Sequence, residues 1–542
     1  MATPTGPYTS ADHDEGVNPR RWQILSVLVV CLLVVVLDNT ILNVALKTIQ
    51  LDLRATQNEL IWAVNGYSLA FAALLFTWGV LGDRYGRKRI LIIGLSLFAS
   101  SSALCAFART PEQLIAFRVL MGAGGACVLP ISLAIITVVF PPRERGRAIG
   151  LWAGSVGAAV AIGPVTGGLL LEHPWLINWL TGNDWGSIFF VNVPIIAAGL
   201  VGIALVVPET RNPRPARLDP QGLLLSVAGL LLLVNGIQQG HWGSWSTYAW
   251  IAGGLALLAL FVFYERRTSH PSIDLSLFRI RSFSVSLAGV SLAFAALQGI
   301  ILFLVFYYQT VRGWSPLQAG LLSLPFAAGQ LLAAPRSGSF VARFGARRVI
   351  MVGLALACVG MVLLAVVPER APVWYLITLG FIFGFGLGCT VAPATTRMTL
   401  ATPPARSGSG SAVQNTIRQV GAALGVAVMS SVVASVYSHR IAGPLNASQL
   451  PQPLRQAASD SVGSTYDVGT QLIESGRATP AQVEPILQAA NDAFMPAFHV
   501  AALVALGLLF LALLLFAALL PREAEAVEWS STETRADADT PQ

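Results

Sequence analysis

Fourteen long apolar segments constrain this chain of 542 residues more than any other feature. A membrane-spanning helix needs roughly 20 mostly apolar residues. The segments that qualify are 23–44, 59–79, 89–108, 112–134, 147–170, 187–207, 219–238, 247–264, 284–308, 316–335, 347–367, 373–394, 410–436 and 496–519. Only 11% of the residues are charged, whereas soluble proteins average about 25%. The sequence therefore predicts an all-α polytopic membrane protein with 14 transmembrane helices in the lipid bilayer.

The positions of the basic residues indicate how the chain is oriented. Most of the 34 Lys and Arg residues fall in the tails and loops on the side of the N-terminus. Cytoplasmic loops carry such an excess in membrane proteins. We therefore expect a multi-pass protein of the cell (cytoplasmic) membrane with both termini cytoplasmic. The net charge of +7 reflects this orientation, and we expect no nucleic acid as a partner.

An internal repeat divides the chain into two halves. The loop motif Gly79–Leu91 aligns without gaps with Gly338–Ile350, at an offset of 259 residues. Repeats of this kind in membrane proteins indicate two half-bundles around a central site. The predicted organisation is a cytoplasmic N-terminal tail (1–22), an N-terminal six-helix half (23–207), two inserted helices with flanking loops (208–281), a C-terminal six-helix half (282–519) with a long extracytoplasmic loop (437–495), and a cytoplasmic C-terminal tail (520–542).

Several motifs carry a family resemblance. The loop motif at 79–91 resembles the signature of the major facilitator superfamily between its second and third helices. The stretch 37–46 is similar to the first-helix motif of the fourteen-helix drug:proton antiporter family, with Lys47 at the usual proline. The stretch 118–124 resembles the fourth-helix motif, with Met121 at the usual Gln, and 150–168 resembles the fifth-helix antiporter motif. The resemblance implies the major facilitator fold and multidrug efflux by an antiporter.

Two charged residues within the predicted spans are the candidates for proton coupling. Asp38 is an acid deep inside the first span, and a carboxylate in hydrocarbon marks a functional site by default. Arg118 enters the fourth span from the outer side and reaches a similar depth, about 8–9 Å below the membrane face at 1.5 Å per residue. Separation of the two side chains during a conformational change would couple proton movement to the side of the membrane from which the binding site is accessible. A static ion pair that ties two helices together is the alternative.

The loop motif and the fifth span supply two further groups of candidates. We expect a cytoplasmic gate that bridges the two halves when the inner side is closed; its residues are Gly79, Asp83, Arg84, Gly86 and Arg87. Small residues in the fifth span let helices approach closely, and we expect an outer seal or simple tight packing there. The residues of this antiporter motif are Gly150, Gly163, Pro164, Gly167 and Gly168.

Aromatic and amide side chains within the predicted spans are the candidates for substrate binding. Such side chains suit hydrophobic, amphipathic or cationic small molecules. They are Asn43, Trp62, Asn65, Tyr67, Gln298, Tyr307, Tyr308, Gln309 and Gln414. Arg418 joins them, either as a ligand for anionic groups or as a side chain that reaches toward the inner surface.

These features favour a proton-coupled exporter of drugs or antibiotics that works as a monomer. We see no nucleotide-binding motif, no metal-ligand spacing and no nucleophile–base pairing, so we expect no enzyme activity, no metal and no cofactor beyond a proton gradient. One alternative is an exporter of an endogenous metabolite, such as a self-made antibiotic, a siderophore or a lipid. Another is a membrane receptor or scaffold that transports nothing, and a third is a uniporter.

Overall fold

The computed structural model describes residues 18–211, 219–239, 244–268, 275–402, 407–448 and 450–520. Within these ranges the chain forms helices joined by turns and short loops, and they contain no strand. Fourteen helical stretches are long and apolar enough to cross a membrane, which confirms the predicted all-α membrane fold. Most of the two predicted tails, 1–17 and 521–542, lies outside the described residues.

The helices before the insert form a first lobe. They are α1 (Arg21–Leu53), α2 (Gln57–Tyr85), α3 (Arg87–Ala106), α4 (Pro111–Gly125), α5 (Val128–Val139), α6 (Pro142–Glu172), the 3-10 turn η1 (Pro174–Leu176), α7 (Asn178–Thr181), α8 (Ser187–Phe190) and α9 (Asn192–Val206). The inserted pair consists of α10 (Pro220–Gln239) and α11 (Trp245–Glu265).

The helices after the insert form a second lobe. They are the 3-10 helix η2 (Leu275–Arg279), α12 (Arg281–Phe306), the π-helical turn η3 (Tyr307–Val311), α13 (Pro316–Leu321), α14 (Leu324–Phe344), α15 (Ala346–Ala365), α16 (Val373–Ala401), α17 (Ser407–Ala447), α18 (Gln452–Ser459), α19 (Val462–Glu474) and α20 (Pro480–Leu519).

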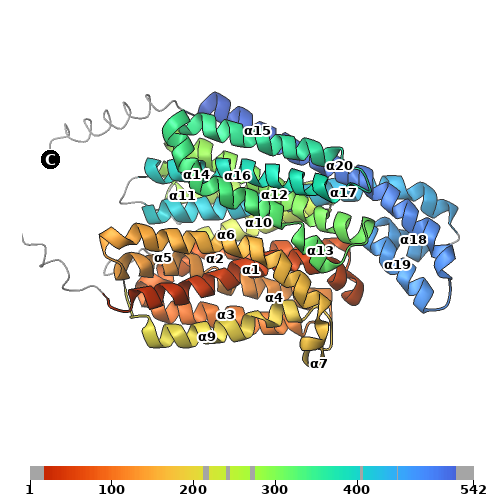
Figure 1. Cartoon of the computed structure of the whole chain (residues 1–542), viewed down its shortest axis with the longest axis horizontal. Helices are drawn as coiled ribbons and strands as arrows, with labels where there is room; N and C mark the ends of the chain where they lie inside the picture. Colours follow the sequence, from red (N-terminus) through yellow and green to blue (C-terminus); the bar gives the residue numbers. More distant parts are fainter. Residues whose placement is uncertain are drawn as a thin grey trace, which may run out of the picture.

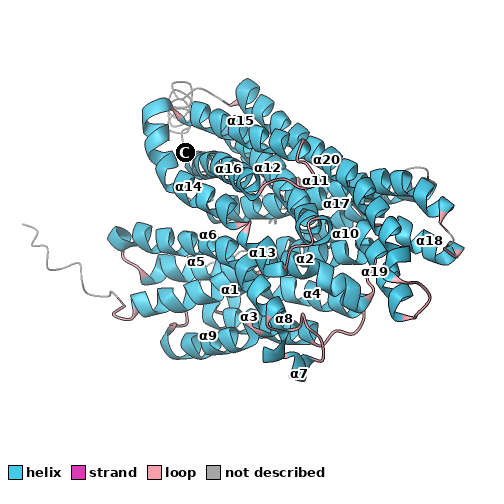
Figure 2. Ribbon diagram, turned by 45° about the vertical axis from the view of Figure 1, so that its right-hand side comes forward, coloured by secondary structure: helices cyan, strands magenta, loops and turns pink. Residues whose placement is uncertain are grey.

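The two lobes lie one above the other, with the start of α1 and the end of α20 on the same side of the bundle (Figure 1). We call this the termini side, and we call the side that carries α18 and α19 the distal side. Figure 2 shows that α18 and α19 extend beyond the main bundle. The lobes meet through α2 and α17 and through α6 with α13 and α14.

Two equivalent turns show the internal repeat in three dimensions. Gly86 joins α2 to α3 with a φ of 113°, and Gly345 joins α14 to α15 with a φ of 82°. Both values lie in the region that residues with a Cβ atom rarely adopt. The repeated glycine of the loop motif is therefore explained by a backbone conformation that both lobes need.

The inserted helices α10 and α11 pack against each other, and α10 also contacts both lobes through α2 and α17. Leu230 and Val234 of α10 meet Leu69 of α2 and Ala423 of α17 in a small apolar cluster. The insert thus covers one flank of the junction between the lobes.

The long distal loop predicted at 437–495 is largely helical. The spans on either side continue beyond their predicted ends, so that α17 runs to Ala447 and α20 begins at Pro480, and α18 and α19 lie between them. Lys47, which the sequence suggests lies in a loop, is instead part of α1. Apolar length marks only the part of a helix in hydrocarbon, so helical turns outside it are missed.

Candidate functional site

Asp38 of α1 and Arg118 of α4 form an ion pair in the interior of the first lobe. Nη1 of Arg118 lies 2.6 Å from Oδ2 of Asp38, and the exposed fractions of the two side chains are 0% and 1%. A charged pair removed from water in this way is retained only where further hydrogen bonds satisfy its remaining atoms. The structure thus brings together the two side chains that we singled out for proton coupling.

Neighbouring helices hold the guanidinium of Arg118 in place. Its Nε donates to the carbonyl of Ala63, at 3.2 Å. Its Cζ lies 4.2 Å from the ring centre of Tyr67, and the hydroxyl of Tyr67 donates in turn to the carbonyl of Val35. Nη2 of Arg118 has no hydrogen-bond partner among the described residues. One donor of the guanidinium is therefore free to take a new partner when the pair rearranges.

The amide of Asn192 is the third member of this site, and the sequence analysis missed it. Its Nδ2 donates to Oδ1 of Asp38 at 2.9 Å and lies 3.1 Å from the hydroxyl of Ser102. Asn192 is fully buried at the first turn of α9. A neutral amide at the start of an apolar run resembles an ordinary helix start. The position of Asn192 inside the predicted span 187–207 is the feature by which the sequence could have indicated a buried polar group.

The charged loop motif on the termini side forms its bonds within the first lobe. Arg87 bonds Asp83 at 2.8 Å and donates to the carbonyl of Ala134 in α5. Glu209, beyond α9, accepts from the backbone N–H of Lys88. These bonds fix the α2–α3 turn against α5 and the end of α9. The predicted gate function, in which this cluster bridges the two lobes, stays a prediction.

The glycines of α6 allow close approach to α1 and to the second lobe. A Cβ atom on Gly163 would collide with Thr40, and one on Gly167 would come within 3.2 Å of Ile41. Gly168 faces the other way, and a Cβ there would lie 2.5 Å from the Cα atom of Leu317 in α13. By contrast, Gly150 at the other end of α6 has open space around it. Only the distal end of this motif thus serves close packing.

The candidate substrate-binding residues fall into separate groups. Asn65 donates to Gln238 of the inserted helix α10. Gln414 donates to Thr395 of α16, and Arg418 lies over the ring of Phe294 and donates to Asn415.

The remaining candidates have separate sets of neighbours. Tyr307 stacks on Phe498 and donates to the carbonyl of Pro368. Tyr308 stacks on Trp314. Trp62 packs against the apolar cluster around α10, and Asn43 and Gln298 are partly exposed. These contacts do not place the candidates in one pocket.

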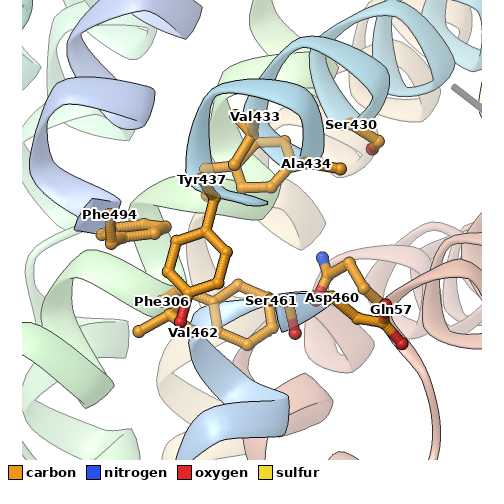
Figure 3. Close-up of a pocket in the computed structure, with 11 residues that line it drawn as sticks. Gln57, Phe306, Ser430, Val433, Ala434, Tyr437, Asp460, Ser461, Val462 and Phe494 are labelled. Carbon is orange, nitrogen blue, oxygen red and sulfur yellow. The ribbon is translucent and has the colours of Figure 1, made fainter. Parts of the chain in front are cut away.

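Two hollows lie on the distal side, where α19 meets the ends of the membrane helices. One has a volume of about 460 Å³ and is lined by Lys47, Asp52, Gln309, Trp314 and Asp467, among others. Burial raises the pKa of Asp467 above its ordinary value, although the hydrogen bond from Gln471 and the charge of Arg54 act in the opposite direction. The other hollow is a small pocket between α2, α12, α17, α19 and α20 (Figure 3).

The comparisons with known proteins agree on the family. Residues 28–426 match the model of the Major Facilitator Superfamily. The multidrug efflux pump LfrA of Mycolicibacterium smegmatis is 34% identical over 85% of this chain and 91% of its own length. The methyl viologen resistance protein SmvA of Salmonella typhimurium is 32% identical over 89% and 94%. The tetracenomycin C resistance and export protein of Streptomyces glaucescens is 33% identical over 78% and 77%.

Solved structures support the fold. A bacterial homologue of the human lysosomal transporter Spinster covers 92% of this chain and 98% of its own, with a TM-score of 0.62 and 19% identity. The xylose transporter XylE from E. coli covers 93% and 98%, with a TM-score of 0.55 and 13% identity. At this level of identity the similarity shows the arrangement of the helices alone.

Proposed function

This chain belongs to the major facilitator superfamily, and we propose that it is a proton-coupled antiporter that exports hydrophobic or amphipathic drugs and antibiotics. The names of the relatives support this class of substrate, because LfrA is a multidrug efflux pump and SmvA confers resistance to methyl viologen. A single chain contains both lobes, so a monomer suffices. The termini side faces the cytoplasm of the cell, in keeping with the arginine-rich turns found there.

The observation that carries the proposal is the buried pair of Asp38 and Arg118. Either charge alone would have a high desolvation free energy in a low-dielectric interior, and the attraction between the two opposite charges offsets part of it. When Asp38 takes up a proton, its charge is lost and its attraction to Arg118 falls. The pair then loosens, and the free Nη2 donor of Arg118 can help form a second arrangement. Proton uptake from outside and release inside would drive exchange between these two arrangements.

The two lobes provide the moving parts. Rocking of lobes around a site at the membrane midplane is how this kind of transporter alternates access. The α1–α4 pair lies wholly within the first lobe, whereas α6 contacts both lobes at its distal end. A rearrangement at Asp38 can therefore reach the junction through α1 and α6, which are packed together.

An experiment in inside-out membrane vesicles tests the function. A growth panel of methyl viologen, puromycin and tetracenomycin C in a pump-deficient host first identifies the compound to which the chain confers most resistance. Adding that compound to energised vesicles should release protons from the lumen, seen with a pH-sensitive dye. With Asp38→Asn we expect at least a tenfold loss of this proton flux. Undiminished flux in this variant would refute the assignment of Asp38.

A second substrate class has one specific observation in its favour. The relative from Streptomyces glaucescens is named for resistance to and export of tetracenomycin C. Within the same mechanism, we propose as the alternative an exporter of an endogenous metabolite, such as a self-made antibiotic. Accumulation of one metabolite in an untreated deletion strain would favour it.

A further inference from the structure

Lys47 and Gln309 link the two lobes on the distal side. Nζ of Lys47, in α1, donates to the backbone carbonyl of Gln309, in η3, at 2.5 Å. The side-chain Nε2 of Gln309 donates back to the carbonyl of Val44, in α1, at 2.7 Å. Gln309 is 2% exposed. Two hydrogen bonds of opposite direction therefore join α1 to the second lobe at this point.

Helix α19 adds a second connection over the same end of α1. Nε2 of Gln50 lies 3.5 Å from the hydroxyl of Ser461. Gly463 packs so closely on Gln50 that a Cβ atom there would collide with its side chain. The ammonium of Lys47 lies 5.7 Å from the ring centre of Tyr466. We call residues 452–474, which contain α18 and α19, the distal segment. The distal segment thus covers the contact between Lys47 and Gln309.

The distal segment itself is anchored to the second lobe. The hydroxyl groups of Tyr437, in α17, and Thr465, in α19, are 2.7 Å apart. The hydroxyl of Tyr466 donates to Asn491 in α20 at 3.3 Å. When the lobes move, α18 and α19 should therefore move with the second lobe.

The first turn of α2 meets this segment at the small pocket of Figure 3. Gln57 from the first lobe and Ser461 and Val462 from the segment line it together with Tyr437 and Phe494. Gln57 is 8% exposed, and its Nε2 has no hydrogen-bond partner among the described residues. The pocket is lined mostly by apolar side chains, and Gln57 brings into it a polar group without a hydrogen-bond partner among the described residues. Water can satisfy such groups when the surfaces separate.

We propose that residues 452–474 form a clasp that closes the exit on the distal side and must release the first lobe before an exported compound can leave. Tyr466 of this clasp lies over the inner contact, in which Lys47 bonds Gln309. Ser461 forms the outer contact, where it lies beside Gln50 and lines the small pocket with Gln57. The inference rests on the proposed export by alternating lobes. It assigns a role to the long distal segment and to Lys47, the residue that stands in place of the usual proline.

Chemical cross-linking of the full-length protein tests the clasp. Gln50→Cys and Ser461→Cys are joined with a short bis-methanethiosulfonate linker, and export of the best compound from the growth panel is measured before and after. We expect at least a tenfold loss, reversed by dithiothreitol. The matched control joins Asn446→Cys to Arg455→Cys, two neighbouring residues that both belong to the second lobe. This control should export within twofold of the unlinked protein.

The outcomes separate the clasp from the function on which it rests. If the unlinked protein exports nothing under a proton gradient, the proposed function fails. If it exports and the 50–461 link leaves the rate unchanged, the clasp is refuted. Distances between nitroxide labels at the same two positions give a readout that needs no exported compound. We expect a short and a long population, and a single short one under all conditions would also refute the clasp.

Substitution of the inner contact gives a second test, in which Lys47→Met is compared with the native Lys47 in the same Gln50→Cys background. Lys47→Met keeps most of the side-chain length but removes the donor to Gln309. We expect Gln50→Cys to react at least threefold faster with a membrane-impermeant maleimide on whole cells when Lys47→Met is present. Lys88→Met is the matched control, because Lys88 lies on the termini side and bonds the carbonyl of Ala204. An unchanged rate with Lys47→Met would contradict the role of Lys47.

Discussion

Asn192 shows how a single neutral side chain can control a buried charge. The carboxylate of Asp38 receives one hydrogen bond from Arg118 and one from Asn192, each on a different oxygen. A buried acceptor that loses its donor costs about 1–3 kcal/mol, and more when it is charged. Asn192 therefore stabilises the state of Asp38 in which the proton has been released.

Replacement of Asn192 should separate coupling from substrate movement. With Asn192→Leu, the charged form of Asp38 is disfavoured and proton release should fail. We expect export driven by a proton gradient to fall at least tenfold. Exchange of one substrate molecule for another needs no net proton movement and should stay within twofold. Both rates are measurable in proteoliposomes.

The control for this prediction is another buried asparagine of the first lobe. Asn65→Leu removes a bond to Gln238 of the inserted helix and leaves Asp38 untouched. It should preserve the ratio between driven export and exchange. An equal loss of both rates in Asn192→Leu would mean that Asn192 serves only the fold.

At the scale of elements, α6 connects the two lobes by close packing at its distal end. Gly168 approaches the backbone of Leu317 in α13, and Gly320 of α13 approaches the carbonyl of Pro164 in return. The two helices can meet this closely because neither carries a side chain at the point of contact.

A pair of alanine substitutions within α6 tests this packing. Gly168→Ala places a methyl group 2.5 Å from a backbone atom of Leu317, and overpacking of this kind costs about 1–3 kcal/mol. Gly150→Ala meets no atom within 4 Å, and alanine in a helix is favoured over glycine by about 0.5–1 kcal/mol. We expect Gly168→Ala to lower the thermal unfolding temperature in detergent and to reduce export, with Gly150→Ala neutral or slightly stabilising. Equal effects of both would argue against a close contact at Gly168.

At the scale of the whole molecule, the two lobes are copies that differ in their surroundings. The turns at Gly86 and Gly345 share a positive φ. Only the first copy of the loop motif contains an acidic residue, Asp83, beside its arginines. Glu209 also lies close to this turn, because a Cβ atom on Gly86 would be 2.5 Å from its carboxylate oxygen Oε1. The first lobe is thus more tightly tied on the termini side than a simple duplicate would be.

Alanine at the two turns should reveal this difference. A strained backbone position costs on the order of 1–3 kcal/mol, so both Gly86→Ala and Gly345→Ala should lower the unfolding temperature. Gly86→Ala should lower it more, because Glu209 must also move. Gly338→Ala is the control, since Gly338 has open space around it. Thermal unfolding followed by intrinsic fluorescence measures all three, and a larger effect at Gly338 than at Gly86 would contradict the argument.

The sequence by itself determined the 14 spans, the repeat and the partnership of Asp38 with Arg118. The spans follow from the length of the apolar segments, the repeat from a fixed offset between two motifs, and the charged pair from the high free energy of a charge in hydrocarbon. All three can be read from the sequence without knowledge of how the helices pack. The tertiary structure alone decided that Asn192 completes this pair, that Gln309 bonds α1 and that α19 reaches across the lobes. These contacts join residues more than 100 positions apart. Neutral polar side chains form no periodic pattern, so only the packing of the helices selects their partners.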